Sequence, residues 1–155
     1  MRYWKYLTMD IVEAINSTAT GSVLVTKHIL PLLKRSDTAD IININGTTGL
    51  ENNRHEQANE AFSAAKAAQS TFADRLRYKL KTSGIRITTI YPPNFENTSP
   101  LNEEQWNEQR GHSDTRYLTA RNVYDSIVFA LKQDRICSID KIILSNNNAS
   151  KAEAL

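Results

Sequence analysis

Three stretches of the sequence carry apolar residues at helical spacing, and each predicts a helix. They span residues 10–35, 58–81 and 119–133, and a shorter helix is expected at residues 103–109. The first stretch opens with Asp10 and Glu13 at the spacing of a capping box, which predicts that Asp10 caps the N-terminus of this helix. Towards its end, Pro31 predicts either a kink or the start of a final turn, because proline fits poorly inside a helix.

Three short apolar runs lie between or after these helices, and each predicts a strand. They span residues 39–45, 85–91 and 139–144. The first run is rich in isoleucine and almost continuous, which is typical of a parallel strand covered on both faces. Because helices alternate with strands, the connections are expected to be right-handed helical crossovers. The pattern therefore predicts an α/β layered fold, with a short parallel sheet of about three strands flanked by helices.

The composition restricts the classes of function. The chain has 155 residues, of which 40% are hydrophobic and 23% charged, as expected for one globular domain. A net charge of +2 is too small to attract nucleic acid or an anionic membrane strongly. No apolar run approaches the roughly 20 residues that cross a bilayer. Cys137 is the only cysteine and the histidines share no metal-ligand spacing, so neither a disulfide nor a metal site is expected. Without an apolar leader, a cytoplasmic location is expected.

The order of several segments is similar to that of a known family. The segments are TGSVLVTKHILPLLK (20–34), ADIININGTTGL (39–50), AFSAAKAAQSTFADRLRYKL (61–80) and GIRITTIYPPNFENTSP (84–100). Together they resemble the C-terminal part of the short-chain dehydrogenase/reductase family, whose members are nicotinamide-dependent oxidoreductases. The resemblance implies a partial Rossmann-like three-layer fold. Residues 1–145 would form the C-terminal part of that domain, and residues 146–155 a flexible tail.

The resemblance also implies a nicotinamide cofactor, NAD or NADP. In the family, a Gly-rich turn that opens the first helix of the domain holds the phosphates of the cofactor. None of the five glycines of this chain lies in such a motif. The half of the domain that binds the adenosine and the pyrophosphate is therefore expected to be missing, so that cofactor binding by this chain alone is doubtful. The choice between NAD and NADP stays open, because the missing half normally determines it.

The catalytic positions of the family can be placed by resemblance, and only the lysine is retained. The family's Tyr-x-x-x-Lys corresponds to Phe62 and Lys66, and the catalytic serine corresponds to Gly46. Phenylalanine has no exchangeable proton, so Phe62 cannot be a general acid or base. Lys66 is expected to position the ribose, and Thr47 or Thr48 to offer a substitute hydroxyl to a substrate carbonyl. The residues alone also allow a solvated lysine and threonines that only form the turn.

The resemblance implies further contacts to the cofactor from the ends of the first two strands and from the loop after the second. The implied cofactor-binding residues are Ile44, Asn45, Lys66, Pro92, Asn94, Phe95 and Thr98. Pro93 replaces a glycine of the family and removes a backbone N–H from this loop. Two functions remain open. One is an oxidoreductase homologue for NAD(P)-dependent carbonyl or alcohol chemistry that is catalytically degenerate on its own. The other is a non-catalytic pseudoenzyme or dimerisation module from a truncated gene.

The long helices predict a partner chain. One side of the helix that contains Phe62 carries a mostly apolar stripe. A second side, which includes Ala61, carries a stripe of small residues. Two sides of this helix are therefore expected to be buried. In the family, two such helices pack against their copies in a second subunit. The resemblance therefore implies a homo-oligomer through residues near 11–33 and 60–80. The strand at 41–45 is expected to have a bare edge, which favours pairing with another chain.

Overall fold

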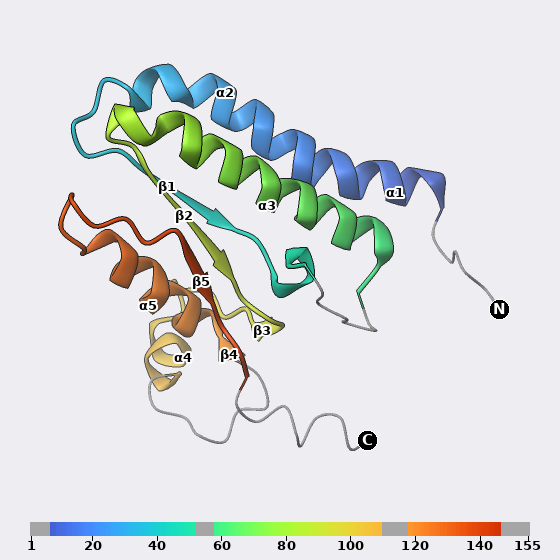
Figure 1. Cartoon of the computed structure of the whole chain (residues 1–155). Helices are drawn as coiled ribbons and strands as arrows, with labels where there is room; N and C mark the ends of the chain where they lie inside the picture. The colour runs from blue at the N-terminus through green and yellow to red at the C-terminus, as the bar shows by residue number, and fades with distance from the viewer. Residues whose placement is uncertain (1–6, 52–57, 110–117, 147–155) are drawn as a thin grey trace.

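The computed structural model describes residues 7–51, 58–109 and 118–146. In this part of the chain a three-stranded parallel sheet lies between two layers of helices, which confirms the predicted α/β fold class (Figure 1). The strand order is β1 (Asp40–Ile44), β2 (Arg86–Tyr91), β5 (Lys141–Ile143). One face of the sheet carries α1 (Thr8–Ile15), α2 (Gly21–Leu33) and α3 (Glu60–Leu80), and the other carries α5 (Ala120–Leu131) and, beyond it, α4 (Glu103–Glu108).

The predicted first helix forms a single helical path with a wider turn in its middle. The π-helical turn Asn16–Thr20 joins α1 to α2. Ser17 Oγ donates a hydrogen bond to Glu13 O at 2.7 Å, and Ser22 Oγ donates one to Thr18 O at 2.6 Å. Hydroxyl groups that bond to the preceding turn in this way compete with the backbone ladder and bend helices. The apolar spacing predicted the helix but not this turn.

The prediction that Asp10 caps the N-terminus of this helix is wrong. For Pro31 the sequence allowed a kink or a final turn, and the final turn is confirmed. The helix begins at Thr8, and the Asp10 carboxylate accepts a hydrogen bond from the Leu7 N–H at 3.0 Å. Asp10 therefore takes the third position of the helix and reaches back to the residue before it, which is the other half of a capping box. Pro31 lies in the final turn of α2.

The clearest predicted helix, α3, has well-defined ends. Asn59 Oδ1 accepts from the N–H groups of Ala61 (2.8 Å) and Phe62 (3.3 Å) and so caps the helix. At the other end the 3₁₀ turn Lys81–Ser83 leads into Gly84, whose φ of 69° is in the left-handed region. Glycine adopts this conformation without steric cost, as the predicted stop at this position requires.

The strands β1 and β2 differ in burial. Every residue of β2 is buried, whereas β1 is only partly covered and Ile44 exposes 36% of its surface. The prediction that this strand is covered on both faces is therefore wrong. Its position explains the difference, because in the described part of the chain β1 pairs with β2 alone and forms an edge of the sheet. The same observation confirms the predicted bare edge.

One pairing gives no periodic signal in the sequence. β3 (Phe95–Glu96) and β4 (Leu118–Thr119) form a separate two-stranded parallel sheet, with Phe95 opposite Leu118. Strands of two residues are too short to show an alternation of apolar and polar positions. This pairing holds the segment after β2 beside the start of α5.

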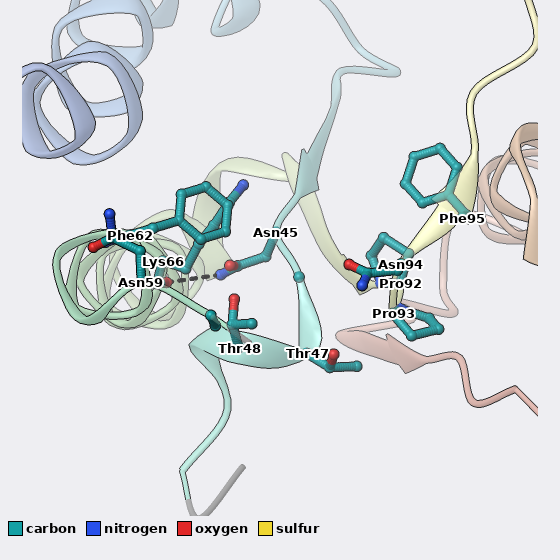
Figure 2. Close-up of a pocket in the computed structure, with 12 residues that line it drawn as sticks. Asn45, Thr47, Thr48, Asn59, Phe62, Lys66, Pro92, Pro93, Asn94 and Phe95 are labelled. Atoms are coloured by element: carbon teal, nitrogen blue, oxygen red, sulfur yellow. Dashed lines mark hydrogen bonds between the residues drawn. The ribbon is translucent and has the colours of Figure 1, made fainter. Parts of the chain in front are cut away.

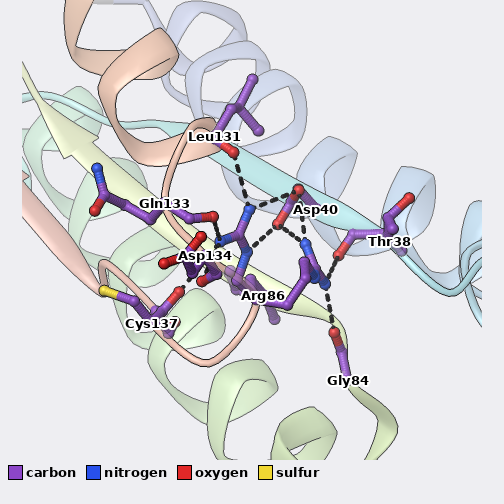
Figure 3. A network of polar contacts seen from close by, with 12 residues as sticks. Thr38, Asp40, Gly84, Arg86, Leu131, Gln133, Asp134 and Cys137 are labelled. Carbon is purple, nitrogen blue, oxygen red and sulfur yellow. Dashed lines mark hydrogen bonds and ion pairs between the residues drawn. The ribbon is translucent and has the colours of Figure 1, made fainter.

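A buried arginine ties the edge strand to the end of α5 (Figure 3). Arg86 on β2 makes two hydrogen bonds to the Asp40 carboxylate of β1, at 2.7 and 3.1 Å. The same guanidinium donates to the carbonyls of Leu131, Gln133 and Cys137. Desolvation raises the pKa of Asp40, but the hydrogen bonds and charges of Arg86 and Arg135 outweigh it and hold this pKa below its ordinary value.

None of the helices in the described ranges is long and apolar enough to cross a membrane. The described chain ends at Asn146, so the predicted flexible tail at 146–155 lies almost wholly outside the described residues.

Candidate functional site

A cavity of about 530 Å³ opens where β1 and β2 end and α3 begins (Figure 2). In parallel α/β sheets, ligands bind at this carboxyl edge of the strands. Its walls contain all but two of the residues that the family resemblance implied, namely Asn45, Thr47, Thr48, Lys66, Pro92, Asn94 and Phe95. Of the other two, Ile44 contributes its carbonyl to a lysine contact, and Thr98 is bonded to Gln109 outside the lining.

Lys66 provides the positive charge of this cavity. Its Nζ donates weakly to Ile44 O at 3.4 Å and to Gln69 Oε1 at 3.3 Å, and it lies 5.6 Å from the centre of the Phe62 ring. Both hydrogen-bond partners are neutral oxygens, and an ammonium group has three N–H donors. Burial of the side chain lowers the pKa of Lys66. A donor therefore remains for a polar group bound in the cavity.

The turn after β1 packs directly on the backbone of α3. Asn45 Nδ2 donates to Lys66 O at 3.0 Å, and Gly49 lies against the same peptide group. A Cβ at Gly49 would lie 2.8 Å from the backbone C and O of Lys66 and 2.7 Å from Asn45 Oδ1. Only glycine fits this approach. The turn and the lysine are thereby held in a fixed relation.

Two polar atoms beside this turn are buried without a hydrogen-bond partner within the described part of the chain. They are Asn45 Oδ1 and Thr48 Oγ1. Buried polar groups are normally paired, because an unpaired one loses its bonds to water without replacement. Both residues line the cavity, so a bound group with a hydroxyl or an N–H is the kind of ligand that could satisfy them.

The two glycines of the turn should respond differently to substitution. We expect Gly49→Ala to lower the free energy of unfolding by about 2 kcal/mol, because its Cβ overlaps the backbone of α3. Gly46→Ser is expected to change it by less than about 0.5 kcal/mol. At Gly46 the backbone is extended (φ 176°), and a Cβ meets Thr48 Oγ1 at an ordinary 3.5 Å. Urea unfolding of both variants tests the difference, and equal stabilities would contradict the close approach.

Phe62 lies one helical turn before Lys66 and exposes 39% of its surface at the cavity. Figure 2 shows it beside Lys66 on α3, across the cavity from Asn94 and Phe95. Its ring provides an apolar wall but no proton. Asn59 also lines the cavity and was missed as a site residue. An asparagine directly before a helical run is a recognisable cap signal, and capping places this residue at the same mouth as Phe62.

Residues 5–110 match the model of the short chain dehydrogenase family. The chain belongs to this family. An uncharacterized oxidoreductase of Staphylococcus epidermidis is 25% identical over 130 residues, which are 84% of this chain and 52% of that protein. The chain thus spans about half the length of the curated relatives it matches.

Solved structures of other family members show the same fold. The closed form of serine dehydrogenase complexed with NADP+ has a TM-score of 0.72 at 22% identity, covering 90% of this chain and 57% of that one. A tyrosine-to-phenylalanine variant of ElxO with NADPH bound has a TM-score of 0.71 at 19% identity, covering 94% of this chain and 60% of that one. In both comparisons the matched region is little more than half of the solved chain.

Proposed function

We propose that this chain is an oxidoreductase homologue that carries the nicotinamide-facing part of an NAD(P)-dependent carbonyl or alcohol site, and that it is catalytically degenerate on its own. The observation that carries the proposal is the half-buried Lys66 beside Asn45 and Thr48 at the carboxyl edge of the sheet. The resemblance to the family provides the cofactor class. A cytoplasmic location, expected from the sequence, is part of the proposal.

Each group in the cavity has a proposed role. Lys66 donates to the hydroxyls of the nicotinamide ribose with the N–H that its two weak internal contacts leave available. Thr48 Oγ1 donates to a substrate carbonyl, and Thr47 at the same turn is the alternative donor. Pro92, Asn94 and Phe95 form the opposite wall, where the cofactor would lie. The cofactor itself supplies or accepts the hydride.

The proposed degeneracy has two physical causes. Phe62 brings no proton to the position from which the family's tyrosine acts, and a positioned acid or base commonly contributes about 10²–10⁴-fold in rate. The chain also spans only about half of the relatives' length and contains no Gly-rich turn for the pyrophosphate. A tyrosine-to-phenylalanine variant of ElxO has NADPH bound, so a tyrosine of that protein can lose its hydroxyl without loss of this cofactor.

A titration with NADH and NADPH tests this proposal. We expect dissociation constants weaker than about 100 μM, equivalent to less than roughly 5.5 kcal/mol of binding free energy. Lys66→Met should weaken the residual binding at least about threefold, which is the order of one hydrogen bond. Lys79→Met, at an exposed position of the same helix, is the matched control and should leave it unchanged. Binding tighter than 100 μM contradicts the proposed loss of cofactor binding, and equal binding by the Lys66 variant contradicts its role.

A second candidate function, a non-catalytic dimerisation module, is favoured by the apolar surface of α1 and α2. Val12, Val23 and Leu24 are exposed there, with Leu24 at 48%. We propose a homo-oligomer through residues near 11–33 and 60–80, and expect a dimer in sedimentation at micromolar concentration. Leu24→Glu should shift it to monomer, whereas Leu101→Glu, at an exposed position outside these helices, should not. A stable, cooperatively folding monomer would count against this proposal.

A further inference from the structure

Lys66 is the one charged side chain among the described residues that line the cavity of about 530 Å³. The rest of this lining is neutral, and the rings of Phe62 and Phe95 make parts of its walls apolar (Figure 2). Within the described ranges the salt bridges do not include Lys66, whose polar contacts are the neutral oxygens of Ile44 and Gln69. Its ammonium form therefore has no carboxylate there to stabilise it.

The attachment of Lys66 keeps its amine at the cavity. Asn45 Nδ2 donates to Lys66 O at 3.0 Å, and Gly49 packs on the same peptide group, so the base of the side chain is fixed. The two hydrogen bonds of Nζ, at 3.3 and 3.4 Å, are longer than ordinary N–H···O bonds. Little bonding is therefore lost when the amine turns toward a molecule in the cavity.

The protonation of Lys66 differs from that of a paired lysine. Burial of its side chain lowers the pKa of Lys66. Lys141 is the opposite case, because its Nζ donates to Asp74 Oδ2 at 2.8 Å and this bond raises its pKa. The Phe62 ring attracts an ammonium, but at 5.6 Å it is near the outer limit of such contacts. Lys66 therefore has a larger neutral fraction at pH 7 than the roughly one part in 10³ of an ordinary lysine.

A neutral amine attacks a carbonyl carbon, whereas an ammonium has no electron pair for this reaction. Lysines that are desolvated in apolar pockets form Schiff bases with carbonyl compounds for this reason. Only the neutral fraction reacts, so Lys66 can be protonated most of the time and still react faster than an exposed lysine. The aromatic walls of the cavity favour a carbonyl compound with an apolar substituent.

We propose that Lys66 captures apolar aldehydes or ketones in this cavity as a reversible imine. The electron pair of Nζ forms a bond to the carbonyl carbon, and one N–H proton passes to the oxygen, which gives a carbinolamine. The second N–H proton then leaves the nitrogen, the C–O bond breaks, and the oxygen departs as water. Amine and carbonyl thus give an imine and one water, with nothing oxidised or reduced. No nicotinamide takes part, so this activity goes beyond the proposed redox function.

Reductive trapping of the full chain with benzaldehyde and cyanoborohydride at pH 7 tests the proposal. Cyanoborohydride reduces an imine to a stable benzylamine, and peptide mass spectrometry gives the labelling rate at each lysine of the same sample. Lys66 should be labelled at least about tenfold faster than the exposed Lys79 and the paired Lys141, which corresponds to one unit of pKa. In guanidinium chloride, which unfolds the chain, this ratio should fall to about one. Equal rates in the folded chain, or a preference that survives unfolding, overturn the proposal.

Lys66→Arg separates imine formation from the holding of a ribose. Arginine keeps the positive charge and the N–H donors, but it stays protonated and forms no imine under these conditions. The fast labelling should be lost while Lys79 is labelled as before, and an unchanged circular dichroism spectrum shows that the variant is folded. Fast labelling that persists elsewhere in this variant overturns the assignment to Lys66. Because the reaction contains no NADH or NADPH, its outcome is independent of the cofactor titration.

A second aldehyde tests the class of compound. Acetaldehyde has a methyl group where benzaldehyde has a ring, so it gains less from apolar walls. The preference for Lys66 over Lys79 should therefore be at least about threefold smaller with acetaldehyde. Taking the ratio of the two lysines removes the difference in intrinsic reactivity between the aldehydes. An equal preference with both aldehydes would contradict the assigned apolar class.

Discussion

Replacing Arg86 with methionine should lower the free energy of unfolding by about 3 kcal/mol. The guanidinium is buried and is shared between the Asp40 carboxylate and the carbonyls at the end of α5. Methionine retains much of the apolar stem but no donor, so a partly buried carboxylate and several carbonyls lose their partner. For a chain of this length, that loss corresponds to a fall of about 6–12 °C in the melting temperature.

Arg135→Met is the matched control for this variant. Arg135 also bonds to both Asp40 oxygens at 3.0 Å, but its side chain is 35% exposed. Water replaces an exposed pair more easily, so a loss of about 1 kcal/mol is expected. Equal losses in the two variants would show that burial of Arg86 adds nothing to the network.

The pH dependence of this difference provides a second readout. The pKa of Asp40 in the folded chain lies below its ordinary value of 3.8. The stability that this carboxylate contributes is therefore complete above that value and is lost as the pH falls through the folded pKa. The gap between the original chain and the Arg86→Met chain should be constant near neutral pH and should narrow below about pH 4. A gap that widens in acid would contradict the assignment.

The sequence predicted the order and type of the regular elements because their apolar periodicity is strong. The isoleucine run at 41–44 and the alanine-rich helix around Ala65 are examples, and both form where the pattern indicated. The burial of β1 was mispredicted for a physical reason. A continuous apolar run indicates that a strand needs cover, but it does not show whether the described chain contains the segment that covers it.

The residues of the candidate site were predicted from the family resemblance. The contacts between them could not be predicted from the sequence. The approach of Gly49 to the Lys66 backbone joins residues far apart in the sequence, and no spacing rule connects them. The same holds for Arg86, whose partners come from β1 and from the end of α5. Such contacts depend on how the strands align, which the periodicity of single segments does not determine.

Replacing Phe62 with tyrosine should raise the rate of NADPH-dependent carbonyl reduction by about 10²–10⁴-fold, the usual contribution of a positioned general acid. The ring already faces the cavity, with the Lys66 ammonium 5.6 Å from its centre. A nearby positive charge stabilises a phenolate, so the pKa of the introduced phenol is expected to lie below its ordinary value of about 10. The phenol can then give its proton to a carbonyl oxygen as hydride arrives from the cofactor.

The rate is measured as loss of NADPH absorbance with a panel of aldehydes and ketones. Phe95→Tyr adds a phenol to the opposite wall of the same cavity and is the matched control, with no gain expected. Absorbance titration of the new phenol gives an independent readout, and Lys66→Met in the same chain should return its pKa toward 10. A phenol with a lowered pKa but no gain in rate, under conditions where NADPH binds, would show that the remaining groups of the cavity do not align a carbonyl with the cofactor. Such a result would favour the non-catalytic module over a degenerate oxidoreductase, because Lys66 and the turn at Thr48 would be in place but would support no reaction.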